Sequence, residues 1–183
     1  MRLFFGLPLP PDAQQAAGDR AQLAQRLLPG RYALAENYHL TLAFLGEVPQ
    51  ERLPDAQAAL ESCVSRFPAP MVTLGAVDHF GRADKAILIL RAQSDPPLEP
   101  LHENLLSALE KAGLPFDSGP FAPHVTLARH ADASRLSALD PACFSPCAVF
   151  RARQACVYLS ARDGENVLRY TPLFRADFTE FNI

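Results

Sequence analysis

Residues 39–43 read His-Leu-Thr-Leu-Ala, and residues 124–128 read His-Val-Thr-Leu-Ala. Each copy lies in an apolar, β-favouring context: N-Y-H-L-T-L-A-F-L-G around the first and F-A-P-H-V-T-L-A-R around the second. Side chains on a strand alternate between its two faces with a period of two. The histidine and the threonine of each copy therefore share one face, while the apolar residues beside them point the other way. The polar faces carry His39 with Thr41 and His124 with Thr126.

The repetition gives this pattern its weight. The chain contains 5 histidines, and two of them have the same H-x-T-L arrangement. A single histidine on a strand is ordinarily a hydrogen-bonded structural or surface residue, but that interpretation does not explain two matched copies. We interpret the two strands as halves of one site, and the remaining histidines, His79, His102 and His130, as surface or loop residues.

Length and composition predict one soluble globular domain over residues 1–183. The chain is 49% hydrophobic and 20% charged, which is ample for a core. Its net charge of -3 excludes a general basic field for wrapping nucleic acid, so a nucleic-acid substrate would be bound at a terminus or at one nucleotide. No signal peptide, transmembrane-length run or C-x-x-C motif is visible, and we expect a cytoplasmic protein with reduced thiols.

Hydrophobic periodicity and the positions of proline and glycine predict alternating strands and helices. The predicted strands are 2–7, 38–45, 71–77, 85–91, the second motif from 124, 147–160 and 166–178. The predicted helices run from 12 to before Pro29, over 51–66, over 98–112 and, briefly, over 132–139. A loop, D-H-F-G-R-A-D, separates the strands at 71–77 and 85–91, and R-D-G-E-N is a hairpin turn between the last two strands.

This order of elements predicts an α+β fold. The two motifs lie almost half a chain length apart. We therefore expect two similar lobes, each with an antiparallel β-sheet flanked by helices. The two sheets would be pseudo-symmetric, and the active-site cleft would lie between them where the motif strands meet.

Two histidines on such strands can perform acid–base catalysis. Histidine titrates near neutral pH, so one imidazole can accept a proton from water while the other donates a proton to a leaving oxygen. The hydroxyls of Thr41 and Thr126 can hold the oxygens of a phosphate between them. Arg129 is also a candidate phosphate ligand, although its odd offset from His124 would turn it to the opposite face of a regular strand.

Other kinds of site have weaker support. The sequence contains no H-E-x-x-H, H-x-H or D-x-D-x-D-G motif for a metal, and no G-x-S-x-G motif for a serine nucleophile. It also lacks the glycine patterns of Walker and Rossmann nucleotide sites. We therefore expect no metal and no cofactor.

The paired motifs resemble those of the two-histidine phosphoesterase superfamily, and within it the bacterial RNA 2′,3′-cyclic phosphodiesterases, also called 2′-5′ RNA ligases. The resemblance also includes R-L-F-F at the start, the F-G-R loop, V-Y-L-S and Y-T-P-L-F. It implies a bilobal α+β fold and metal-independent hydrolysis of an RNA 2′,3′-cyclic phosphate to a 2′-phosphate. By that resemblance His39 is the general acid that protonates the 3′ oxygen, His124 is the base that activates water, and the two threonines bind the phosphate.

The chain departs from the family in the residues expected to contact the nucleobase of the RNA. Family members often carry a Trp in the strand that residues 86–90 occupy here, and this chain has no Trp. Contacts with the nucleobase would then have to be made by Phe80, Phe121 or Tyr38. The expected substrate-binding residues are Thr41, Thr126, Arg129, Phe80 and Tyr38.

Several functions stay open on the sequence alone. The same site could join 2′-5′ RNA ends reversibly, or open a small cyclic nucleotide or an ADP-ribose cyclic phosphate. A different class of function is a non-catalytic module that binds nucleotides or RNA ends. In all cases the expected partners are RNA ends or nucleotides carrying a cyclic phosphate, with no membrane partner, and the chain is expected to be a monomer. The negative net charge favours short substrates.

Overall fold

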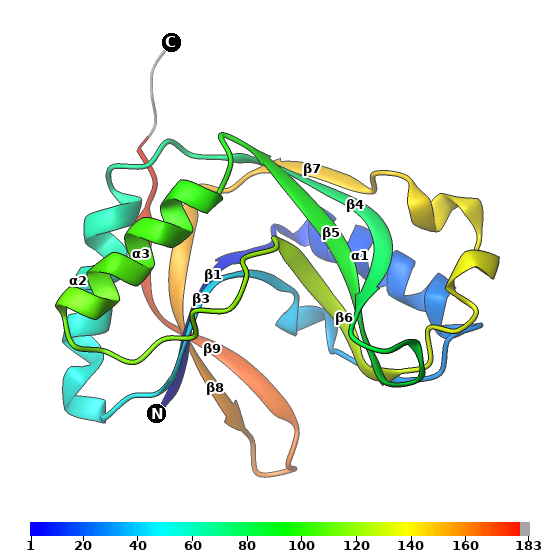
Figure 1. Ribbon diagram of the computed structural model, residues 1–183, viewed down its shortest axis with the longest axis horizontal. Helices are drawn as coiled ribbons and strands as arrows, with labels where there is room; N and C mark the ends of the chain where they lie inside the picture. Colours follow the sequence, from blue (N-terminus) through cyan, green and yellow to red (C-terminus); the bar gives the residue numbers. More distant parts are fainter. Residues whose placement is uncertain (180–183) are drawn as a thin grey trace.

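The computed structural model describes residues 1–179 (Figure 1). Over these residues the strands are β1 (Arg2–Pro8), β2 (Arg31–Tyr32), β3 (His39–Glu47), β4 (Met71–Phe80), β5 (Ala86–Asp95), β6 (His124–Ala131), β7 (Ala148–Arg151), β8 (Gln154–Arg162) and β9 (Leu168–Asp177). The α-helices are α1 (Pro11–Gln25), α2 (Leu53–Val64) and α3 (Glu99–Lys111). The fold is α+β, as the sequence predicts.

The described strands form one antiparallel sheet, which corrects the expectation of two separate sheets. Its order is β7-β4-β5-β6-β3-β1-β8-β9, and β2 pairs with β6. The two halves of the sheet meet where β3 and β6 pair, and that pairing consists of Leu40 opposite Val125 alone. The two predicted lobes are therefore half-sheets, joined at the start of both motifs.

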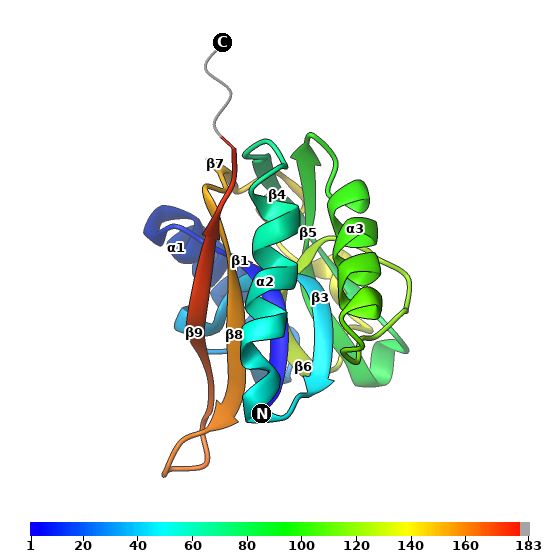
Figure 2. The same ribbon diagram turned by 90° about the vertical axis from the view of Figure 1, so that its left-hand side faces the viewer.

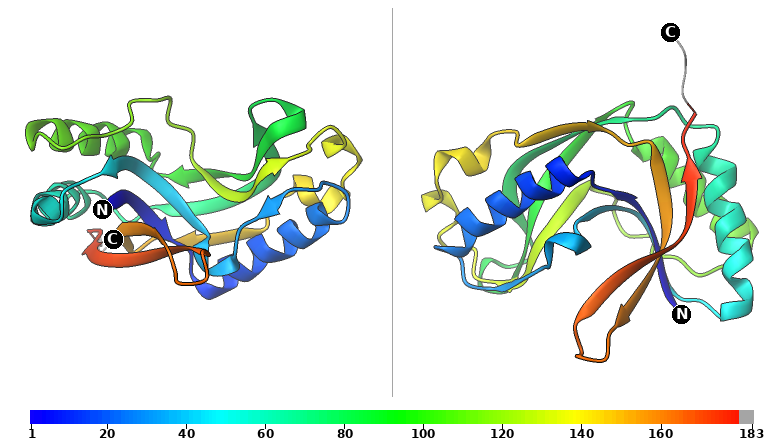
Figure 3. Two further views of the ribbon diagram at one scale, coloured as in Figure 1. Left: turned by 90° about the horizontal axis from the view of Figure 1, so that it is seen from below. Right: turned by 180° about the vertical axis from the view of Figure 1, so that it is seen from behind.

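The sheet must curl, because β7 and β8 are neighbours in the chain but lie far apart in the strand order. Six strand spacings separate them, about 29 Å in a flat sheet. The link from Arg151 to Gln154 can span only about 11 Å. The sheet consequently bends into a half-barrel that brings the β7 edge back towards β8, and Figure 3 shows this curvature from below and from behind.

This return of the chain also explains why the predicted strand over 147–160 is two strands. β7 pairs with β4, whereas β8 pairs with β1, so the direction of the chain changes at residues 152–153.

The predicted helix over 132–139 is wrong: only a 3₁₀ turn, Leu136–Ala138, forms there, and Pro141 begins a second one. Proline cannot continue a preceding helix. Residues 78–80, expected in a loop, complete β4.

The three α-helices cover different halves of the sheet. Each has a proline in its first turn, where the missing N–H costs no hydrogen bond. Helix α1 packs against β4, β6 and β7, whereas α2 packs against β8 and β9, and α3 against α2 and β3. Figure 2 shows α2 and α3 side by side, with α1 farther back. No helix within residues 1–179 is long and apolar enough to cross a membrane.

Candidate active site

Both motifs line a single cleft of about 710 Å³. Leu40 and Val125, which pair across the β3–β6 junction, are fully buried in the core. Because side chains alternate along a strand, the flanking histidines and threonines point into the concave side of the curled sheet. The cleft lining includes all four of the predicted motif residues, His39, Thr41, His124 and Thr126.

His39 is closely surrounded by protein groups. Its Nδ1 lies 2.7 Å from the backbone carbonyl oxygen of Asn37, and its Nε2 lies 3.0 Å from Oγ1 of Thr41. The rings of Phe4 and Tyr170 lie 4.6 Å and 4.9 Å from the imidazole, the second edge-on. Burial lowers the pKa of His39 to about 4, against the opposing effect of the Asn37 carbonyl; the charges of His124 and Arg129 lower it further.

His124 has fewer neighbours. Its Nδ1 lies 2.7 Å from the carbonyl oxygen of Ala122, and the ring of Phe80 meets its imidazole edge-on at 4.9 Å. Burial also lowers the pKa of His124; the Ala122 carbonyl opposes this, and the charge of Arg129 adds to it.

The same tautomer follows for both histidines. A carbonyl oxygen can only accept a hydrogen bond, so each Nδ1 must carry the proton and donate it. In the neutral ring each Nε2 is then a hydrogen-bond acceptor. At His39 that acceptor faces the Thr41 hydroxyl, which can donate to it.

Arg129 lines the cleft because β6 contains a bulge. Leu88 of β5 pairs with Ala128, but the next residue, Ile89, pairs with Thr126, so Leu127 is an additional residue. A bulge of this kind reverses the alternation of side chains beyond it. The odd spacing from His124 therefore does not turn Arg129 away, and its charge reaches both histidines.

The aromatic candidates for base contacts have different positions. Phe80 lies beside His124. Tyr38 is only 4% exposed and belongs to the core, which corrects the expectation that it binds substrate: it neighbours His39 in sequence and so points to the opposite face. Phe121 stacks on His102 at 4.3 Å.

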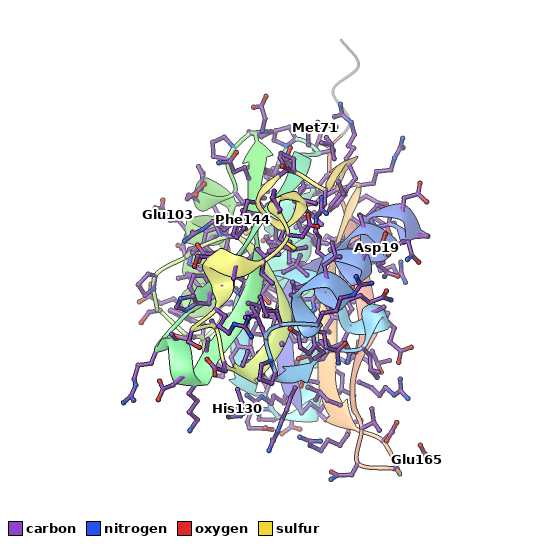
Figure 4. The ribbon with its side chains drawn as sticks, turned by 90° about the vertical axis from the view of Figure 1, so that its right-hand side faces the viewer. Asp19, Met71, Glu103, His130, Phe144 and Glu165 are labelled. Atoms are coloured by element: carbon purple, nitrogen blue, oxygen red, sulfur yellow. The ribbon has the colours of Figure 1, made fainter. Side chains whose placement is uncertain are left out.

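Of the three other histidines, which were expected to be surface or loop residues, His79 and His102 are half-buried in secondary structure, whereas His130 is exposed. The half-buried His102 bonds through Nδ1 to the carbonyl of Leu42. His79 lies in β4, and its Nδ1 is buried. His130 has a positive φ of 51° and lines the rim of the cleft near the end of β6 (Figure 4).

Sequence reasoning missed most of the cleft wall outside the motifs. The residues concerned come from β1, β2, β8, β9 and the segment before β3, and they include Arg2, Phe4, Arg31, Asn37, Ser160, Arg162 and Tyr170. The alternation of Arg2 and Phe4 in β1 was a usable signal. The others reach the cleft through the curl of the sheet, which no local pattern indicates.

Asn37 has a particular role in holding the cleft together. It is 8% exposed and is the single buried polar residue of the described chain. Its side chain donates to the carbonyl of Leu168 at 2.8 Å and accepts from the N–H of Tyr170 at 3.2 Å. Its own carbonyl holds His39. One residue thus joins the motif strand to the β8–β9 hairpin, whose tip is marked by Glu165 in Figure 4.

The cleft is also defined by what it lacks. None of the residues that line it is an aspartate or glutamate. Over residues 1–179, no group of three or more His, Cys, Asp and Glu side chains is arranged to hold a metal ion.

An α+β half-barrel with two H-x-T strands sharing one cleft defines a two-histidine protein suited to phosphate esters. Residues 10–164 match the family model of the 2′-5′ RNA ligase superfamily, and the chain belongs to this superfamily. This finding confirms the family drawn from the motifs.

Individual relatives agree with this assignment. The RNA 2′,3′-cyclic phosphodiesterase of Escherichia coli K12 is 32% identical over 181 residues, covering 98% of this chain and 97% of that protein. The RNA 2′,3′-cyclic phosphodiesterase of Geobacillus stearothermophilus is 31% identical over 128 residues, 69% of this chain, but this stretch spans only 41% of that protein. The crystal structure of E. coli LigT complexed with 3′-AMP matches with a TM-score of 0.76 and 29% identity, covering 98% of each chain.

Proposed function

We propose that this protein hydrolyses RNA 2′,3′-cyclic phosphates to 2′-phosphates by general acid–base catalysis with His39 and His124. One observation carries the proposal. Each histidine fixes its Nδ1–H on a backbone carbonyl, and both rings line one cleft that also contains the two motif threonines. This leaves two Nε2 atoms available to move protons at one substrate.

The reaction needs one proton acceptor and one proton donor. Nε2 of His124 takes a proton from water as the water oxygen bonds to phosphorus. The bond between phosphorus and the 3′ oxygen breaks, and Nε2–H of His39 protonates that oxygen. The product carries a 2′-phosphate and a 3′-hydroxyl. The relationship to named RNA 2′,3′-cyclic phosphodiesterases supports the reaction, and the assignment of the two roles follows the family resemblance of the motifs.

The remaining polar groups suit the charge on phosphorus. The hydroxyls of Thr41 and Thr126 and the guanidinium of Arg129 line the same cleft. Donors held in place before the reaction stabilise charge that develops on the non-bridging oxygens. Arg129 can bind two phosphate oxygens at once through its planar guanidinium.

The protein groups around the cleft disfavour a charged imidazole, so the general acid must gain its proton with the substrate. Burial and Arg129 lower the pKa of both histidines. A phosphate monoanion placed beside them raises the pKa of the nearest ring, because an opposite charge favours the protonated form. Substrate binding therefore takes up a proton, and the site becomes an acid–base pair only when it is occupied.

Joining of RNA ends is a second candidate, favoured by the description of the family as 2′-5′ RNA ligases. The 5′-hydroxyl of a second RNA would replace water as the nucleophile, with the same base and the same acid. The product would be a 2′-5′ diester and a 3′-hydroxyl. The purely binding alternative accounts less well for the site, because binding alone does not need two proton carriers whose Nε2 atoms meet in one cleft.

The test is a turnover assay on a short RNA that ends in a 2′,3′-cyclic phosphate, with and without EDTA. We expect a 2′-phosphate product, identified by ³¹P NMR, at a rate that EDTA does not change. The variant His39→Asn/His124→Asn, which retains the size and polarity of both side chains, is the matched control and should be inactive. A second RNA bearing a 5′-hydroxyl in the same assay measures ligation.

Three results would count against the proposal. A 3′-phosphate product would mean that the 2′ oxygen leaves. Loss of turnover in EDTA would replace the two-histidine mechanism with a metal-dependent one. Tight binding of the RNA with no turnover would favour the binding module.

A further inference from the structure

The cleft concentrates positive charge in a chain whose net charge is -3. Its lining contains the four arginines Arg2, Arg31, Arg129 and Arg162, with no carboxylate among them. Three arginines elsewhere on the surface pair with carboxylates: Arg52 with Asp55, Arg82 with Asp84, and Arg91 with Asp78. No carboxylate among the residues that line the cleft can neutralise its arginines in this way.

Arg31 is the most unusual of these cations. It pairs directly opposite Arg129 across the β2–β6 ladder. Like charges opposite each other on neighbouring strands are destabilising. Over residues 1–179, no carboxylate forms an ion pair with either side chain to offset this repulsion. An anion bound between or beside them would remove the repulsion.

The backbone around Arg31 is firmly held. A Cβ added at Gly30 would lie 2.9 Å from Cβ of Ala131, so β2 approaches β6 more closely than another residue would allow. The hydroxyl of Tyr32 donates to the carbonyl of Leu28, and the N–H of Ala33 donates to that of Leu127. The backbone of this short strand is fixed on both sides, so it needs no further ordering when Arg31 binds a ligand in the cleft.

The arginines of β1 and β8 that line the cleft, Arg2 and Arg162, already contact other groups of the protein. The guanidinium of Arg2 lies 5.1 Å over the ring of Phe44. Arg162 donates to the carbonyl of Asn166 in the β8–β9 turn. Among residues 1–179, Arg31 has neither kind of contact, so its donors remain the most available for a ligand.

A count of charges shows what that ligand needs. A cyclic phosphate diester carries one negative charge, and Arg129 acts on both histidines at the place where that phosphate would react. A nucleoside cyclic phosphate without a further anionic group would leave Arg31 unmatched. The next phosphate along a nucleic acid is the one on the 5′ oxygen of the same nucleotide.

We propose that Arg31 binds the phosphate on the 5′ oxygen of the reacting nucleotide, so that the cleft holds two phosphates. The inference rests on the proposed function and extends it from the reacting group to the kind of substrate. That phosphate can be the phosphodiester of an oligonucleotide or the terminal phosphate of a mononucleotide. In both cases the chain selects a 5′-phosphorylated nucleotide over one with a free 5′-hydroxyl.

Binding can be tested without turnover. The ligands are three product-like molecules with a 2′-phosphate: a nucleoside, a 5′-phosphorylated nucleoside and a dinucleotide. The variant is Arg31→Gln, and Arg66→Gln, at an exposed position just beyond the end of α2, is the matched control with the same change in charge. The affinities are measured by calorimetry at several salt concentrations.

We expect Arg31→Gln to weaken binding of either 5′-phosphorylated ligand by about tenfold, the value of one hydrogen-bonded charge contact. Binding of the ligand with a 5′-hydroxyl should change by less than about twofold, since it lacks the group that Arg31 contacts. The slope of log K against log salt should become shallower for the dinucleotide, because one charge contact that salt screens is lost. Arg31→Lys should restore the slope, and Arg66→Gln should leave all three affinities unchanged.

The comparison between the ligands identifies the source of the second phosphate. Equal losses for the dinucleotide and the 5′-phosphorylated nucleoside support the Arg31 site for both, and a larger loss for the dinucleotide supports an oligonucleotide substrate. Equal losses for all three ligands would overturn the inference, because Arg31 would then act on the reacting phosphate. No loss for any ligand would also overturn it. Failure of the wild type to hydrolyse a cyclic phosphate would reject the proposed function and leave the binding result standing.

Discussion

The two copies of the H-x-T motif are almost identical in sequence and differ greatly in their surroundings. His39 lies against the rings of Phe4 and Tyr170, bonds to Thr41 and is held by Asn37. His124 has one carbonyl partner and the edge of one phenylalanine. The strand pattern therefore sets which way each imidazole points, and the neighbours that the curled sheet brings to it set how readily it takes a proton.

This difference bears on which histidine is the acid. Burial lowers the pKa of His39 to about 4, and it also lowers that of His124, which is more open. The family resemblance makes His39 the acid, the ring that the empty cleft protonates least readily. The roles are consistent only if the substrate phosphate, or its leaving oxygen, acts more strongly on His39 than on His124. The comparison between the two rings can therefore be tested chemically.

The largest effect should come from replacing either histidine. We expect His39→Ala and His124→Ala each to lower kcat by about 10²–10⁴-fold, the usual contribution of a general acid or base. A substrate with sulfur at the bridging 3′ position separates the roles, because a thiolate leaves without needing a proton. The sulfur substrate should restore most of the activity of His39→Ala and little of that of His124→Ala, measured as the ratio of kcat for the two substrates.

His102→Gln is the control for this comparison. It retains a hydrogen-bond donor to the Leu42 carbonyl and lies outside the cleft, so its rates should match those of the wild type. If sulfur rescued His124→Ala instead, the two roles would be reversed, as the pKa order in the empty cleft would favour.

A smaller effect should come from Asn37, which acts on the reaction only through His39 and the β8–β9 hairpin. Asn37→Ala leaves the Leu168 carbonyl and the Tyr170 N–H without partners, and we expect it to lower the free energy of unfolding by about 1–3 kcal/mol. Because Tyr170 also touches the His39 ring, kcat/KM should fall by about tenfold through a displaced imidazole. Urea denaturation and steady-state kinetics measure the two changes.

The variant Asn37→Asp tests whether Asn37 positions the His39 imidazole or only stabilises the fold. A carboxylate near His39 raises the pKa of the imidazole, so the limb of the pH–rate profile that reports His39 should move to higher pH. Asn104→Ala, on the exposed side of α3, is the control and should change neither quantity. An unchanged pH profile in Asn37→Asp would assign to Asn37 a structural role alone.

Sequence reasoning succeeded where a local pattern decides the structure. Alternation along the strands placed His39 and His124 in one cleft, and the proline and glycine positions located the three α-helices. Sequence reasoning failed where the structure depends on pairing between strands that are far apart in the chain. The two half-sheets join through Leu40 and Val125 alone, and a two-residue link forces the sheet to curl.

The same distinction explains the individual residues of the site. The side on which Arg129 lies could not be decided from the sequence, because the bulge at Leu127 depends on pairing with β5, and pairing registers are not visible in one strand. Tyr38 was chosen for being aromatic beside a histidine, although alternation already turned it towards the core. Asn37 and Tyr170 stand in segments that resemble the family, but nothing in those segments marks them as cleft residues, and Arg31 lies in a segment without any motif. Only the folded sheet brings the three residues to the cleft.

The smallest predicted effect is the pH dependence of stability caused by the enclosure of His39. An unfolded histidine has a pKa near 6.5, whereas the folded pKa of His39 is about 4. Between these values the unfolded chain binds a proton that the folded chain does not. The stability contribution is therefore complete above pH 6.5 and is lost as the pH falls towards 4. Because the ring is partly open to the cleft, we expect a loss of about 1–2 kcal/mol between pH 7 and pH 5.

His39→Gln should reduce this pH dependence, since glutamine does not titrate, while His124→Gln should reduce it less. Other titrating groups change stability over the same range in all three proteins, so the quantity to compare is the difference between each variant and the wild type. Urea denaturation at pH 7 and pH 5 gives that difference directly. Equal reductions in the two variants would show that the aromatic enclosure does not separate the two histidines. The difference in their surroundings would then have to act on the bound substrate rather than on the empty site.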